Sequence, residues 1–142
     1  MDNLYNTALS YVGCPHVNRG NLKGVGLDCC TIIAHIIKET RGKEIEINFN
    51  YSGDWFCKRN CEEILLPYLE KYFSRTDEPA PGDVISFRWG RAKYAHLAMV
   101  IDNQRVVHCS ADSGVEITRL NNPYFTDGQG RSRVTGYWRL KE

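Results

Sequence analysis

The chain has 142 residues, of which 42% are hydrophobic and 11% aromatic, and 18 basic side chains nearly balance 17 acidic ones, leaving a net charge of +1. This length suits one domain with a sizeable core, and the hydrophobic content excludes a disordered chain. The balanced charge lacks the basic footprint of a nucleic-acid binder, so we expect no nucleic-acid partner.

Targeting signals and cysteine usage indicate the compartment. Residues 1–13 contain no Lys or Arg and no apolar run of signal length, and no stretch reaches the ~18–20 apolar residues of a membrane span. We therefore expect a protein made in the cytoplasm without a signal peptide and with no membrane partner. In such a chain, cysteines favour free thiols, a metal site or a catalytic thiol over a disulfide scaffold. The six are Cys14, Cys29, Cys30, Cys57, Cys61 and Cys109.

Helical patterns occupy the first half of the chain. Apolar residues over 4–12 follow helical spacing after Asn3, the expected N-cap, and stop at Gly13. A later helical stripe covers 64–73, where Pro67 should kink the helix unless the helix starts just before it.

A further helix is predicted between these two. Asp28 is its expected N-cap, and Cys29 and Cys30 fall in its first turn. Its apolar face is a stripe of four isoleucines, Ile32, Ile33, Ile36 and Ile37.

Strand patterns occupy the second half. Short segments rich in β-branched and aromatic residues, separated by turn residues, cover 83–87, 96–102, 105–110, 114–120 and 134–140. Helices first and strands second predict a single α+β domain over 1–142, with N-terminal helices packed on one side of a C-terminal antiparallel sheet.

The paired cysteines are the candidate nucleophiles. In the first turn of a helix, unpaired N–H groups and the helix dipole favour the thiolate of Cys29 or Cys30, although both could instead be small core residues. Helical phase does not choose between them. A cysteine nucleophile needs a base, and His96 and His108 lie on two predicted neighbouring strands. Either histidine alone is most simply structural, but the two together with a thiol favour nucleophilic catalysis.

The connection between these two strands predicts a separation of the histidines. With a two-residue turn at 103–104, Met99 lies opposite His108, and His96 lies roughly 10 Å further along its strand, on the other face. A three-residue loop would place Val100 opposite His108, which restores the shared face but lengthens the gap. Contact between the two rings would then need a bulge or strong coiling.

A zinc site is the alternative use of the remaining thiols. Cys57 and Cys61, with Cys14 and His16, could supply four ligands. The spacing of Cys57 and Cys61 is that of two residues facing a core beside a helix, so we expect no metal.

The motifs resemble those of the NlpC/P60 cysteine peptidases, in the family's order and over nearly the whole chain. A stretch reading Lys-Gly-Val-Gly-Leu-Asp-Cys over 23–29 is similar to the branch encoded with bacteriophage tail genes. The motifs that follow the first helix are Gly13-Cys14-Pro15-His16, Leu22-Lys23-Gly24-Val25-Gly26-Leu27-Asp28-Cys29, Pro81-Gly82-Asp83-Val84-Ile85-Ser86-Phe87, Ala95-His96-Leu97-Ala98-Met99-Val100, Val107-His108-Cys109-Ser110 and Gly136-Tyr137-Trp138-Arg139.

The resemblance implies a papain-like α+β fold and a thiol mechanism without a cofactor. In it Cys29 is the nucleophile, His96 the base and His108 the residue that orients His96. His16 and Asp28 are then the candidates for substrate or oxyanion binding, beside the Cys29 backbone N–H at the helix N-terminus.

The family's usual substrates are peptidoglycan stem peptides, often cut beside γ-D-glutamyl residues. The phage branch would add other tail proteins as partners and a virion or prophage origin. Two alternatives stay open, a catalytically silent structural tail component and a thiol-dependent acyltransferase of the same fold.

Overall fold

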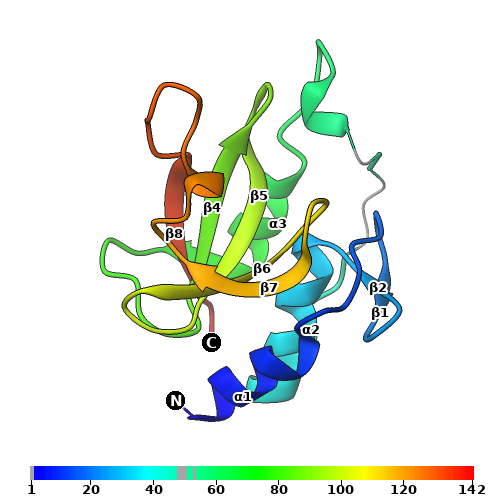
Figure 1. The fold of residues 1–142 in the computed structure, drawn as a ribbon, viewed down its shortest axis with the longest axis vertical. Helices are drawn as coiled ribbons and strands as arrows, with labels where there is room; N and C mark the ends of the chain where they lie inside the picture. Colours follow the sequence, from blue (N-terminus) through cyan, green and yellow to red (C-terminus); the bar gives the residue numbers. More distant parts are fainter. Residues whose placement is uncertain (1, 48–50, 53) are drawn as a thin grey trace.

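The computed structural model describes residues 2–47, 51–52 and 54–142, and within them the chain forms three α-helices and a six-stranded antiparallel sheet (Figure 1). The helices are α1 (Asp2–Tyr11), α2 (Cys29–Arg41) and α3 (Leu65–Tyr72). The sheet order is β3 (Phe73–Arg75), β8 (Val134–Leu140), β4 (Val84–Trp89), β5 (Ala92–Val100), β6 (Arg105–Ser110) and β7 (Gly114–Arg119). The smaller elements are β1 (Asn21–Leu22), β2 (Gly26–Leu27), η1 (Trp55–Cys57) and η2 (Pro123–Phe125). The predicted α+β class is confirmed.

The sheet separates two hydrophobic clusters because successive side chains on a strand point to opposite faces. On β5, Leu97 and Met99 join the cluster that contains the helices, whereas Ala98 and Val100 join a second cluster around Phe125. Helices α2 and α3 both contact β5, and α1 packs against α2 (Figure 1). The N-terminus of α2 is thus held beside the central strands.

Local sequence accounts for α2. The Asp28 carboxylate accepts hydrogen bonds from the N–H groups of Cys30 and Thr31, as predicted for its N-cap, and Gly42 ends the helix at a φ of 68°. The four isoleucines are each at most 1% exposed. Burying each one contributes about 1.5–3 kcal/mol, so packing holds α2, and with it the start of the helix, firmly in place.

The other two helices differ in detail from the sequence prediction. Helix α1 already includes Asp2, so Asn3 is not its N-cap, and Leu9 and Val12 of the expected stripe are exposed. Helix α3 starts at Leu65, which places Pro67 in the first turn, where its missing N–H costs no hydrogen bond.

The β5–β6 hairpin has a different register from either one predicted. Ala98 lies opposite His108, and the pairing runs without a register shift. The cause is Asp102, whose Oδ1 accepts from the N–H groups of Gln104 and Arg105 at 2.9 and 2.8 Å and shapes a three-residue loop over 102–104. His96 is therefore only two residues from the partner of His108 and on the same face, so no bulge is needed.

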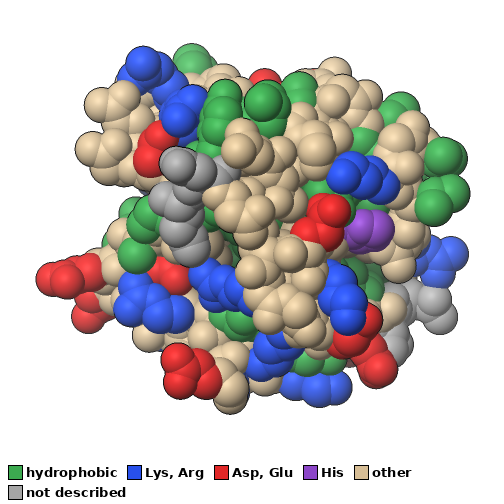
Figure 2. Space-filling model, turned by 90° about the horizontal axis from the view of Figure 1, so that it is seen from below, with side chains coloured by type: hydrophobic (Ala, Val, Ile, Leu, Met, Phe, Trp, Pro, Cys, Tyr) green, Lys and Arg blue, Asp and Glu red, His purple; other side chains and the backbone are tan. Residues whose placement is uncertain are grey.

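The surface carries charges of both signs. In Figure 2, Lys and Arg side chains are interspersed with Asp and Glu, as the net charge of +1 suggests. None of the described helices is both long and apolar enough to pass through a bilayer. All six cysteines are free thiols.

Candidate active site

A cleft of about 130 Å³ lies between the start of α2 and the strands β4, β5 and β6. It brings together four of the residues predicted from the sequence, namely Cys29, His96, His16 and Asp28. Aromatic side chains from four separate segments form much of its wall, namely Tyr51, Trp55, Phe56, Trp89 and Tyr124.

The two neighbouring thiols of α2 have different surroundings. Cys29 is half-buried and lines the cleft, whereas Cys30 is 1% exposed and belongs to the core. The hydrogen bond with Cys29, and then burial, raise the pKa of the Cys30 thiol well above its usual value. Helix α2 therefore presents the Cys29 thiol to the cleft and keeps the Cys30 thiol protonated.

Asp28 is occupied by the protein itself. Its Oδ1 caps α2, and its Oδ2 accepts from the Arg19 N–H at 2.8 Å and from the Tyr51 hydroxyl. A carboxylate has no proton to donate to an oxyanion, and this one is 3% exposed. Its contacts give it the task of fixing the helix start and Tyr51.

Tyr51 is a cleft residue that the sequence analysis did not identify. Burial, followed by the nearby thiols and Asp28, raises the pKa of its hydroxyl, so it stays protonated and donates to Asp28. It is a lone tyrosine in a turn-rich stretch, and no periodic pattern marked it.

The two predicted histidines are in direct contact. Nε2 of His96 lies 2.8 Å from Nδ1 of His108, with the ring planes at 84°. His108 is fully buried behind His96, which is 8% exposed. Burial, then the charges of His108 and His16, lower the pKa of His96 well below its usual value. Burial also lowers the pKa of His108, against the opposing effect of Glu116. Both rings are therefore neutral at neutral pH, and His96 can accept a proton.

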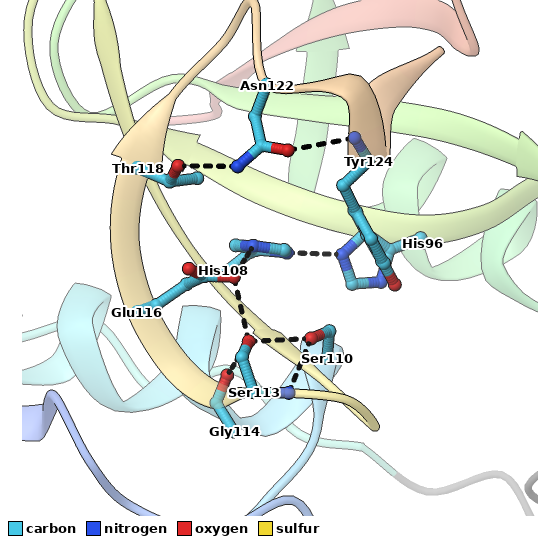
Figure 3. A network of polar contacts seen from close by, with 9 residues as sticks. All are labelled: His96, His108, Ser110, Ser113, Gly114, Glu116, Thr118, Asn122 and Tyr124. Carbon is cyan, nitrogen blue, oxygen red and sulfur yellow. Dashed lines mark hydrogen bonds and ion pairs between the residues drawn. The ribbon is translucent and has the colours of Figure 1, made fainter. Parts of the chain in front are cut away.

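Tyr124 covers the histidine pair and is a second cleft residue missed from the sequence (Figure 3). Its ring centroid lies 5.6 Å from that of His96 and 5.2 Å from that of His108. The Asn122 side chain holds it by accepting from the Tyr124 N–H at 2.9 Å and donating to Thr118 Oγ1 at 2.9 Å. Burial raises the pKa of Tyr124 to about 12.

The wall around Trp55 and Phe56 is docked on the tip of the β4–β5 hairpin. The Phe56 carbonyl accepts from the Arg91 N–H at 2.7 Å. A Cβ at Gly90, whose φ is 57°, would lie 2.6 Å from that same carbonyl oxygen. Glycine is thus required here both for the backbone angle and for the close approach.

The predicted candidates outside the thiol and histidine pair occupy different places. His16 lines the cleft from the segment that leads to α2, and its backbone pairs with that of Leu27. The alternative zinc set is not assembled, since Cys14 is buried and Cys57 is exposed on η1. Within 2–47, 51–52 and 54–142, no three His, Cys, Asp or Glu side chains are placed to hold a metal ion.

The model of the NlpC/P60 family matches residues 13–134, which is most of the chain and includes the whole thiol and histidine arrangement. The chain belongs to the NlpC/P60 family. The resemblance noted in the sequence is thereby confirmed at the level of the family. Comparison with the curated proteins gave no match.

Solved structures of NlpC/P60 proteins share this fold. An NlpC/P60 family protein from Bacillus cereus ATCC 10987 is 25% identical over 97% of this chain and 39% of its own, with a TM-score of 0.67. A Staphylococcus aureus subsp. aureus Mu50 protein described as similar to a lipoprotein of the NLP/P60 family is 18% identical over 99% of this chain and 41% of its own, with a TM-score of 0.68. The NlpC/p60 domain of the peptidoglycan hydrolase SagA is 13% identical over 99% of this chain and 97% of its own, with a TM-score of 0.63. The chain thus spans about two fifths of the first two proteins and nearly all of the SagA domain.

Proposed function

We propose that this protein is a cysteine peptidase that hydrolyses peptide bonds in the stem peptides of bacterial peptidoglycan. The observation that carries the proposal is the cleft itself, in which a thiol at a helix N-terminus and a neutral histidine backed by a second histidine face the same space. A nucleophile, a base and a residue that orients the base are the parts that acyl transfer through a thioester requires.

The mechanism follows from these positions. Neutral His96 takes the proton of the Cys29 thiol, and the thiolate attacks the scissile carbonyl to form a tetrahedral intermediate. The imidazolium then donates its proton to the leaving amine, which leaves an acyl thioester on Cys29. His96 next takes a proton from water, whose oxygen attacks the thioester carbonyl. The bond between the acyl carbon and the Cys29 sulfur then breaks, the acid is released, and the imidazolium returns its proton to the thiolate. His108 holds the ring of His96 throughout, and the Cys29 N–H and His16 are the donors proposed for the oxyanion.

The lining of the cleft suits a short peptide. Five aromatic rings form part of its wall, and such rings bind apolar surface and stack on planar peptide groups at little entropic cost. The SagA domain that shares the fold comes from a peptidoglycan hydrolase, which supports wall peptides as the substrate class. We propose cleavage beside γ-D-glutamyl residues, as the sequence resemblance implies.

Incubation with purified muropeptides in ¹⁸O-labelled water, followed by mass spectrometry, tests the proposal. We expect cleaved stem peptides with ¹⁸O in the new carboxyl group. Cys29→Ser and His96→Ala should abolish them, because general acid–base catalysis alone supplies ~10²–10⁴-fold. Cys57→Ser, which removes an exposed thiol outside the cleft, is the matched control and should keep full activity. Products joined to an added amine instead of ¹⁸O would indicate an acyltransferase, and unchanged muropeptides would indicate a structural protein.

We further propose that the protein acts as a component of a phage tail. The support is the stretch over 23–29, which is similar to the tail-gene branch of the family. The test is mass spectrometry of phage particles purified from an induced host, with and without the tail. Detection in tailed particles alone would support the assignment, and its absence from both would refute it.

A further inference from the structure

Glu116 stands directly behind the histidine pair. In the register of β6 and β7 it lies opposite His108, so the two side chains share a face. Its Oε2 lies 3.0 Å from Nε2 of His108, the ring nitrogen that points away from His96 (Figure 3). His108 thus bridges His96 and a carboxylate while remaining fully buried.

The turn between β6 and β7 holds this carboxylate in place. Ser113 Oγ donates to Oε2 of Glu116 at 2.7 Å, and Ser110 Oγ lies 2.8 Å from Ser113 Oγ. The Ser113 N–H donates to Ser110 Oγ at 3.2 Å, which closes the turn (Figure 3). The same oxygen of Glu116 therefore faces a hydroxyl donor and the imidazole of His108.

The proton arrangement of both rings follows from these contacts. A carboxylate only accepts hydrogen bonds, so the proton of neutral His108 must be on Nε2, facing Glu116. Its Nδ1 is then bare and accepts from Nε2–H of His96. Because neutral His96 carries one ring proton, its Nδ1 is the bare nitrogen. Without Glu116, the contact between the rings would equally allow the reverse arrangement, in which Nδ1–H of His108 donates to a bare Nε2 of His96.

We propose that Glu116 is a positioning residue, which fixes the tautomers of His108 and His96 and so leaves Nδ1 of His96 as the basic nitrogen. The catalytic consequence rests on the proposed function, but the tautomers themselves do not. If His96 carried its proton on Nδ1 instead, that nitrogen could not take the proton of Cys29.

Nitrogen-15 NMR of the histidine rings reads the tautomers directly. Long-range ¹H–¹⁵N spectra at neutral pH distinguish a protonated from a bare ring nitrogen. Spectra of His16→Asn, His35→Asn and His108→Asn assign the four rings. In the unmodified protein we expect both His96 and His108 to carry the proton on Nε2. A proton on Nδ1 of His96 would overturn the proposal whether or not the protein cleaves wall peptides.

Variants of Glu116 separate positioning from general structural support. In Glu116→Ala we expect the Nε2–H pattern of His108 to be lost or mixed, and kcat on muropeptides to fall roughly tenfold or more with little change in KM. Glu116→Gln keeps an acceptor oxygen, so the pattern should persist and part of the lost kcat should return. Glu70→Ala, which removes an exposed carboxylate on α3, is the matched control and should change neither. Unchanged tautomers in folded Glu116→Ala would refute the proposal.

Discussion

Replacing Asp28 by Asn distinguishes the roles of the two carboxylate oxygens at the start of α2. The Asn oxygen can still accept from the N–H groups of Cys30 and Thr31, since Asn is as good an N-cap as Asp. The amide nitrogen then takes the place of Oδ2, which accepts from the Arg19 N–H and the Tyr51 hydroxyl. An amide nitrogen cannot accept, so the Arg19 N–H and the Tyr51 hydroxyl both lose this acceptor.

The expected loss of stability follows from these contacts. A hydrogen bond to a charged group contributes about 1.5–3 kcal/mol, and water near the half-exposed Tyr51 replaces part of it. Asp28→Asn should therefore lower the free energy of unfolding by about 2–4 kcal/mol. Asp28→Ala also removes the cap and should cost about 1 kcal/mol more.

Urea unfolding followed by tryptophan fluorescence and far-ultraviolet circular dichroism measures these differences. Tyr51→Phe deletes one of the two donors and should give a smaller loss than Asp28→Asn. If Asp28→Asn stayed within about 0.5 kcal/mol of the unmodified protein, as a surface substitution does, Oδ2 would not stabilise the fold and the reasoning would fail.

The remaining predictions concern the thiols and the histidines. Substoichiometric iodoacetamide at mildly acidic pH should label Cys29 first, and Cys30→Ser should stay active while Cys29→Ser does not. If Cys30 were labelled first and Cys29→Ser were active, the assignment of the nucleophile would be reversed. His108→Asn should retain more kcat than His108→Ala because its amide oxygen can accept from His96, and equal losses would indicate a purely structural residue. Because the pKa of His96 is lowered in the folded protein, the unfolded chain binds more protons than the folded one below about pH 6.5, and stability should fall as the pH drops from there. His96→Gln should show a smaller fall in Tm over the same pH range, and an identical fall would show that His96 does not contribute.

Local signals explain which parts could be predicted from the sequence. Asp28 and the isoleucine stripe define α2 within a few residues, so the place of Cys29 and Cys30 at its start was predictable. The strands were recognised by composition, but their register depends on loop geometry. The side chain of Asp102 set the β5–β6 register, and one residue of error moved His96 to the wrong face.

The rest of the cleft is formed by long-range packing. Tyr51 comes from a turn-rich stretch and Tyr124 from the short η2, and no periodic pattern in either segment shows that the two meet in the cleft at the start of α2. Glu116 is a different case. The predicted strands 105–110 and 114–120 leave a three-residue connection, and that length already places Glu116 opposite His108.

The position of β8 has a consequence for how the protein matures. This last strand inserts between β3 and β4, pairing with both, while the strands that carry the histidines are made earlier. Until residues 134–140 leave the ribosome, one edge of β4 is open and β3 has no partner in the described sheet. Open edges of this kind promote aggregation. A nascent chain halted before residue 134 should therefore depend on chaperones.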